Sequence, residues 1–217
     1  PRLHEFLREM SREAFLEEGL VVVGEAWGAD VERAKLYSAP DRSEMSMVFQ
    51  FQHICLDNEP GKEKWDRIPL HLPDLKACFA AWQQGLAGKG WNSLFWENHD
   101  LPRIVSRWGD GSEKAATMLA TILFGMQGTP YIFQGQELGM TNVRYELEEY
   151  RDIEIRNMAA ERLAEGYTYE EVMASIHAKG RDNARTPMQW TAGENAGFTT
   201  GKPWIKVNPN HTEINVE

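Results

Sequence analysis

Apolar residues recur along the chain with two alternating periods. A one-faced helical pattern opens it, formed by Leu3, Phe6, Leu7, Met10 and Ala14. Residues 20–23 follow as a short run that is apolar on both faces, as in a parallel strand covered on both sides. The pattern therefore predicts a helix followed by a buried strand.

This alternation repeats through the first two thirds of the chain. Strands are predicted at residues 45–51, 93–96 and 131–133. Helices are predicted at residues 31–37, at 75–86 behind an Asp74 cap and at 115–126 behind a Ser112 cap. Strands that alternate with helices indicate a parallel α/β sheet, either an open doubly wound sheet or a β/α barrel. The period does not distinguish the two.

Polar residues follow each predicted strand, and these are Glu25; Gln52 and His53; Asn98, His99 and Asp100; Gln134 and Gln136. In a barrel the carboxyl ends of all strands face one mouth, so Glu25 and Asp100 are expected to converge on one pocket. Carboxyl groups in different environments suit the cleavage of glycosidic bonds, because one must hold a proton while another stays ionised. The apolar strand behind Glu25 and the neighbouring Trp27 predict a shielded general acid.

Each of these features also has a plain structural interpretation. A glutamate after a strand can be a solvated loop residue, and Asn-His-Asp can cap the turn that leads to Pro102. Arg181, Asp182 and Arg185 can form a local salt-bridged turn, and the tryptophans can belong to the core. The joint occurrence of the polar residues on one predicted rim favours a functional site.

Composition excludes several classes of partner. The 23 basic and 33 acidic residues give a net charge of −10, which disfavours nucleic acid and anionic membrane surfaces. No apolar run approaches the roughly 20 residues of a membrane span, and the N-terminal residues do not resemble a signal peptide. Cys55 and Cys78 are expected to be reduced thiols, with Cys78 in the core. A cytoplasmic location is therefore expected.

The pattern changes after the last predicted strand. Residues 141–180 are expected to form a polar helical insert, with Thr168 and Glu171 as a capping box. Two loop-like stretches, GRDNARTPMQW and AGFTTGKPW, follow it. No internal repeat or linker is evident, so residues 1–217 are predicted to form part of a single catalytic barrel domain.

Four stretches of the sequence resemble the alpha-amylase family of glycoside hydrolases. VVVGEAWG is similar to the segment with the general acid, and FWENHDLPRIVSRWGD to the segment with the transition-state-stabilising aspartate. GTPYIFQGQELGMTN and GRDNARTPMQW resemble the eighth strand and the loop beyond it. Within the family the similarity is greatest to oligo-1,6-glucosidases and glucan 1,6-alpha-glucosidases. It implies a (β/α)8 barrel of which this chain covers about strands 5 to 8 with their helices.

The resemblance also implies roles for individual residues. Glu25 would protonate the glycosidic oxygen and later activate water, and Asp100 would hold the sugar hydroxyls at the transition state. Trp27 would stack on the acceptor glucose, His99 would bind the same sugar as Asp100, and Arg181 would close the pocket. The residues implied to bind an oligosaccharide substrate are Trp27, Asn98, His99 and Arg181.

Parts of the family pattern have no counterpart here. The nucleophilic aspartate belongs to a segment before the first helix, and the calcium site of some relatives also lies in that N-terminal part, so no cofactor is expected. Gln136 stands where relatives usually have glutamate, with no expected effect on catalysis. The chain alone is therefore expected to be inactive, and to need the N-terminal half of the barrel or to self-associate through open sheet edges.

Several alternatives stay open. Within the family these are a trehalose-6-phosphate hydrolase and an alpha-1,4-glucosidase. Trp27 favours the dextran type over the phosphate-specific one, whereas the preference for 1,6 over 1,4 bonds depends on overall similarity alone. A non-catalytic barrel relative would be expected to lose Glu25 or the Asn-His-Asp triplet, and both are present. A nucleotide-binding open sheet would need a glycine-rich loop where GEAWGAD has a carboxylate.

Overall fold

The computed structural model describes residues 2–17 and 19–217. Pro1 and Glu18, which the predicted domain includes, lie outside the described residues. The chain divides into two compact units. The first unit comprises Pro1–Asn58, Ile68–Phe95 and Leu123–Tyr131. The second unit comprises Glu59–Arg67, Trp96–Ile122 and Ile132–Glu217.

A parallel sheet organises the first unit. Its strands are β1 (Val23–Glu25), β2 (Met47–Phe49), β3 (Ser93–Leu94) and β4 (Thr129–Pro130). β1 pairs in parallel with β2, β3 pairs in parallel with β4, and the parallel bridge between Val48 and Asn92 joins the two pairs. Successive strands are therefore neighbours in the sheet, which confirms the predicted parallel β/α arrangement.

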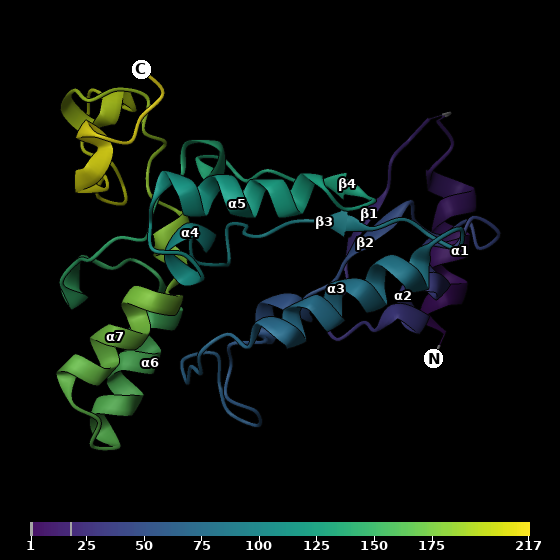
Figure 1. Ribbon diagram of the computed structural model, residues 1–217, viewed down its shortest axis with the longest axis horizontal. Coiled ribbons are helices and arrows are strands. Elements are labelled where there is room, and N and C mark those ends of the chain that lie inside the picture. The colour runs from purple at the N-terminus through teal and green to yellow at the C-terminus, as the bar shows by residue number, and fades with distance from the viewer. Residues whose placement is uncertain (1, 18) are drawn as a thin grey trace. The chain divides into compact units, whose positions relative to one another are not determined.

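Three helices accompany these strands: α1 (Leu3–Ala14), α2 (Val31–Ser38) and α3 (Leu72–Leu86). α2 packs against both β2 and α3, as Figure 1 shows. Their shared core contains the buried residues Ala34, Val48, Trp82 and Leu86, and Cys78 packs against it as predicted. Burial raises the pKa of the Cys78 thiol to about 11, which is consistent with a core residue.

Two predicted strands are displaced by two or three residues. β1 begins at Val23 rather than at residue 20, and Leu20 and Val21 are exposed. The first residue pair between β1 and β2 is Val23 with Met47, so the strand starts where β2 provides a partner. β4 precedes the predicted segment 131–133, although the N–H of Tyr131 extends the ladder by donating to the Leu94 carbonyl (2.7 Å).

The predicted Asp74 cap is also wrong. α3 starts at Leu72, with His71 in the N-cap position and Pro73 in the first turn. Proline favours the first turn of a helix because its fixed φ suits that position and its missing N–H would have no helical partner there. Asp74 instead pairs with His71, at 3.1 Å between Oδ2 and Nδ1.

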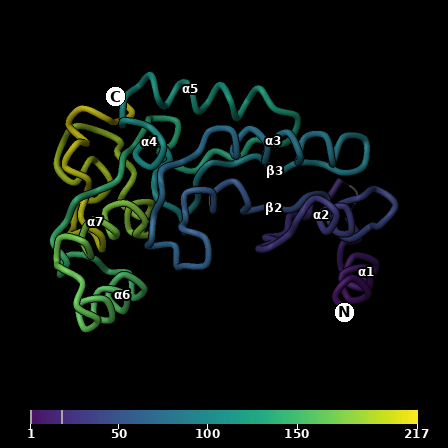
Figure 2. Tube along the Cα trace, turned by 60° about the horizontal axis from the view of Figure 1, so that its bottom comes forward, coloured from purple at the N-terminus to yellow at the C-terminus, as the bar shows by residue number. Residues whose placement is uncertain are grey.

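The regular secondary structure of the second unit is helical. It contains α4 (Ile104–Arg107), most of α5 (Glu113–Phe124), α6 (Ile153–Ala164) and α7 (Tyr169–Lys179). α6 and α7 lie side by side (Figures 1 and 2). Their core includes Tyr150, Ile155, Val172 and Ile176. The short 3-10 turns of the chain are His53–Cys55, Gln136–Leu138, Leu147–Glu149, Arg181–Ala184, Glu194–Gly197 and Pro209–Thr212.

Two predicted helix caps are confirmed in this unit. The backbone N–H of Ala115 donates to Ser112 Oγ at 3.2 Å, at the start of α5. Thr168 and Glu171 form the predicted capping box at the start of α7. Among the residues that the structure describes, no helix is long and apolar enough to cross a bilayer.

Candidate active site

The predicted transition-state stabiliser, Asp100, lies in a tight turn of the second unit. Its backbone N–H donates to Asn98 Oδ1 at 2.8 Å, and the N–H of Leu101 donates to the Asn98 carbonyl at 3.2 Å. Asx side chains stabilise turns in this way because they accept a hydrogen bond from the backbone two residues on. Asn98 therefore shapes the turn that presents Asp100.

Three basic side chains contact the Asp100 carboxylate. Arg185 Nη2 donates to Oδ1 at 2.6 Å, and Arg181 Nη1 lies 3.5 Å from the same oxygen. His99 Nε2 lies 3.2 Å from Oδ2. The two arginines place positive charge beside Asp100, and its side chain is 35% exposed and therefore accessible to a ligand. Arg185 also donates from Nε to the His99 carbonyl (2.8 Å), which links it to the turn itself.

A buried carboxylate holds Arg181 in place. Arg181 donates from Nε and Nη2 to the two oxygens of Asp152, at 2.8 and 2.6 Å, in a bidentate pair. Burial opposes ionisation of Asp152, but the hydrogen bonds from Arg181 and from the N–H of Glu154 outweigh it and lower the pKa of Asp152. Glu154 Oε2 lies 3.1 Å from Arg181 Nε. The pKa of Arg181 is raised, chiefly by the hydrogen bond to Asp152.

Asp182 fixes the segment that carries Asp152. Its Oδ2 accepts hydrogen bonds from the backbone N–H groups of Arg151 (2.6 Å) and Asp152 (3.0 Å). Asp182 is itself buried and lies in the 3-10 turn that begins at Arg181. The turn Arg181–Ala184 and the N-terminus of α6 are thereby locked together.

A second buried ion pair brackets the Asp100 turn. Glu97 Oε1 accepts from Arg103 Nη1 at 2.9 Å, and Glu97 Oε2 accepts from the N–H of Ile104 at 2.5 Å. Both side chains are buried, and burial raises the pKa of Glu97 against the opposing effect of Arg103. This pair was not predicted from the sequence. The available signal was two opposite charges six positions apart, one on each side of the Asn-His-Asp triplet.

The predicted general acid, Glu25, is the last residue of β1 in the first unit. Trp27 Nε1 donates to Glu25 Oε1 at 3.1 Å, and the Trp27 ring stacks on Phe51 with 3.8 Å between centroids. Both Glu25 and Trp27 are exposed. The prediction of a shielded Glu25 is therefore wrong for this chain. β1 ends at Glu25, so its side chain leaves the apolar sheet, and Trp27 contacts one carboxylate oxygen without covering the group.

The predicted site residues thus fall into two groups. The second unit brings together Asn98, His99, Asp100 and Arg181, and the first unit brings together Glu25 and Trp27. That these two groups share one pocket stays a prediction. No cluster of three or more His, Cys, Asp or Glu side chains suited to a metal ion occurs in residues 2–17 and 19–217.

A parallel β/α unit in which a strand ends at a carboxylate, here Glu25 at the end of β1, is found in β/α-barrel enzymes. The family model described as alpha amylase, catalytic domain, matches residues 1–217. The chain belongs to this family.

Several relatives match the chain along essentially its whole length. It is 54% identical to the oligo-1,6-glucosidase of Halalkalibacterium halodurans and 52% identical to the glucan 1,6-alpha-glucosidase of Streptococcus pneumoniae. In both cases 100% of this chain is covered, with 39% and 42% of the relative. The crystal structure of Bacillus licheniformis trehalose-6-phosphate hydrolase matches 99% of this chain and 40% of its own, with a TM-score of 0.94 and 46% identity. The chain therefore spans about 40% of the length of this relative.

Proposed function

We propose that the intact protein containing this chain is a retaining alpha-glucosidase that hydrolyses alpha-1,6-glucosidic bonds in isomalto-oligosaccharides or dextran. The observation that carries the proposal is the accessible Asp100 carboxylate in contact with Arg181 and Arg185. A fixed carboxylate of this kind can bind sugar hydroxyls and stabilise the positive charge of an oxocarbenium-like transition state. The choice of substrate is supported by slightly higher identity to an oligo-1,6-glucosidase (54%) and a glucan 1,6-alpha-glucosidase (52%) than to the trehalose-6-phosphate hydrolase of Escherichia coli (51%).

The proposed mechanism assigns separate tasks to the two groups of residues. Glu25 protonates the glycosidic oxygen as the bond breaks and then removes a proton from the attacking water. Asp100 and His99 hold the hydroxyls of the reacting glucose, and Arg181 closes that end of the pocket. Trp27 offers a stacking surface to the next glucose, because its ring is 60% exposed and is supported from behind by Phe51.

A retaining mechanism requires a second carboxylate as nucleophile, about 5 to 5.5 Å from the acid. Family resemblance puts this aspartate ahead of α1. We therefore propose that residues 1–217 alone do not turn over substrate, and that they either assemble with the preceding part of the barrel or self-associate through exposed sheet edges. Size-exclusion chromatography of residues 1–217 tests this, since a well-folded monomer would contradict it.

Trehalose-6-phosphate hydrolysis is the second candidate. It is favoured by the crystal structure of the B. licheniformis enzyme, which matches this chain with a TM-score of 0.94. The acid and the Asp100 cluster would serve that reaction equally well, because both substrates are alpha-glucosides. The enzyme would distinguish alpha-1,6-glucosides from trehalose 6-phosphate by the part of the substrate on the acceptor side, where Trp27 presents an apolar face.

Kinetics of the intact protein on isomaltotriose, maltotriose and trehalose 6-phosphate test the proposal. We expect the highest kcat/KM on isomaltotriose. Glu25→Gln and Asp100→Asn are each expected to lower kcat by at least about 10²-fold, the usual contribution of such groups. Glu32→Gln, which removes a side chain that is 80% exposed, is the matched control and should keep full activity. A preference for trehalose 6-phosphate would support the second candidate, and full activity of Glu25→Gln would refute both.

A further inference from the structure

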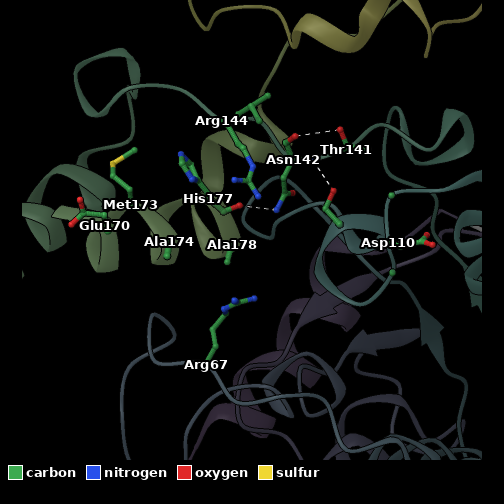
Figure 3. A pocket seen from close by; sticks show the side chains of 14 residues that line it. Arg67, Asp110, Thr141, Asn142, Arg144, Glu170, Met173, Ala174, His177 and Ala178 are labelled. Atoms are coloured by element: carbon green, nitrogen blue, oxygen red, sulfur yellow. Dashed lines mark hydrogen bonds between the residues drawn. The ribbon is translucent and has the colours of Figure 1, made fainter. Parts of the chain in front are cut away.

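A polar cavity of about 780 Å³ lies within the second unit, apart from the Asp100 cluster (Figure 3). One wall is a single face of α7, made by residues three or four positions apart: Glu170, Met173, Ala174, His177 and Ala178. The two alanines leave room where longer side chains would fill the space. The facing walls are the turn Gly109–Gly111, the segment Thr141–Arg144 and the side chain of Arg67.

Hydrogen bonds from Asn142 hold these walls together. Its backbone N–H donates to Ser106 Oγ at 3.0 Å, and its Nδ2 donates to the His177 carbonyl at 3.0 Å. Its Oδ1 accepts the backbone N–H of Arg103 at 2.8 Å. Asn142 thus ties three chain segments into one frame, so the cavity is preformed.

The acidic residues that line the cavity have favourable interactions within the protein, whereas its two arginines have no such partner within the described residues. Asp110 accepts hydrogen bonds from Ser112, which lower its pKa, and Glu170 lies in the first turn of α7, where the helix dipole favours a negative charge. Arg67 and Arg144 form no ion pair or side-chain hydrogen bond within residues 2–17 and 19–217. Figure 3 shows their guanidinium groups extending toward the cavity from opposite walls.

His177 adds a neutral polar group rather than a third charge. Burial lowers its pKa, and the nearby charge of Arg144 lowers it further. Its Nε2 lies 3.4 Å from the carbonyl of Tyr145, so a proton on this nitrogen leaves Nδ1 as an acceptor. An acceptor of this kind suits a hydroxyl group.

We propose that this cavity is a second ligand site, which binds a small phosphorylated sugar through its phosphate at Arg67 and Arg144. Guanidinium groups suit phosphate because they donate paired hydrogen bonds in a fixed plane. The hydroxyls of the sugar would bond to His177 and Glu170. The volume falls within the roughly 300 to 1,000 Å³ of small-molecule sites, and inorganic phosphate alone would leave most of it unfilled.

The charge and the lining also favour this ligand over a neutral glycan. The lining residues of the second unit include no tryptophan, tyrosine or phenylalanine, whose rings would stack on a neutral sugar. The proposal does not depend on the proposed glucosidase activity, because none of Glu25, Asp100 and Arg181 lines the cavity.

Isothermal titration of the intact Asp100→Asn variant with glucose 6-phosphate tests the site in the absence of turnover. We expect saturable binding of one equivalent, with inorganic phosphate weaker and glucose weaker still. Arg67→Gln and Arg144→Gln should each weaken binding about tenfold, the loss expected for one charge-assisted contact. Arg12→Gln, on the surface of α1, is the matched control and should bind normally.

Four outcomes would overturn the proposal. They are the absence of saturable binding at millimolar glucose 6-phosphate, equal binding of glucose, an equal loss in Arg12→Gln, and loss of binding in Arg181→Gln. The last would mean that the phosphorylated sugar occupies the catalytic pocket instead. Thermal unfolding of each variant separates lost binding from lost folding, and the exposed positions of Arg67 and Arg144 predict unchanged melting temperatures.

Discussion

Replacing Asp152 by asparagine should detach Arg181 from its anchor while keeping the shape of the site. The side chain of Asp152 is 1% exposed and accepts two hydrogen bonds from Arg181, at 2.8 and 2.6 Å. Asparagine retains one acceptor oxygen, so one charge-assisted bond is lost, for a cost of about 2 kcal/mol in the free energy of unfolding. The cost stays below the roughly 3 to 5 kcal/mol of a broken buried pair because Arg181 keeps Glu154 and Asp100 as neighbours.

The same substitution should lower activity, since Arg181 positions Asp100. We expect kcat/KM on isomaltotriose to fall at least about tenfold, as for other small displacements of catalytic groups. Urea denaturation and steady-state kinetics of the intact protein measure the two effects. Glu154→Gln is the control. Its side chain is 38% exposed and lies 3.1 Å from Arg181, so we expect a loss of less than about 1 kcal/mol.

The pH dependence of stability provides a further check. The pKa of Asp152 is lowered in the folded state, so its stabilising contribution is complete above the unfolded value of about 4. The contribution is lost as the pH falls through the lower folded value. The stability difference between the wild type and Asp152→Asn should therefore be constant at neutral pH and shrink in acid. Identical unfolding midpoints and identical kcat/KM at pH 7 would refute the anchoring role.

Three further predictions concern other parts of the chain. Thr168→Ala removes the capping box with Glu171 and should destabilise the protein by about 1 kcal/mol in a thermal melt, whereas Thr200→Ala, at an exposed loop position, should not. A thiol-specific reagent at pH 8 should label the exposed Cys55 quickly and Cys78 slowly, because burial raises the pKa of Cys78 to about 11; equal rates would contradict the core assignment. Trp27→Ala should raise KM for isomaltotriose more than it lowers kcat, and an unchanged KM would exclude acceptor stacking.

Local patterns in the sequence predicted what depends on neighbouring residues. The helical stripes and the caps at Ser112 and Thr168 were found because each requires residues within one or two turns. The strand ends were less accurate. β3 and β4 are two residues long, so their ends are set by the backbone of the adjacent strand and not by any period in their own sequence.

The candidate site was predicted by residue type but not by its internal contacts. Arg185 reads locally as one member of a salt-bridged turn, yet it pairs with Asp100, 85 positions away. The anchor of Arg181 is Asp152, 29 positions away at the N-cap of α6. The spacing of residues along the chain does not predict such partners, because only tertiary folding brings them together.

The buried pair of Glu97 and Arg103 illustrates what these distant contacts provide. Desolvation of two charges is costly, and Arg103 Nε is buried without a hydrogen-bond partner, so the pair is poorly explained as a source of stability. The Glu97–Arg103 pair does, however, fix the backbone on both sides of the Asp100 turn. Glu97 accepts the N–H of Ile104, and Arg103 donates to the Gln134 carbonyl at 2.6 Å. Because both ends of the intervening turn are fixed, Asp100 has few alternative conformations, as its proposed role in stabilising a transition state requires.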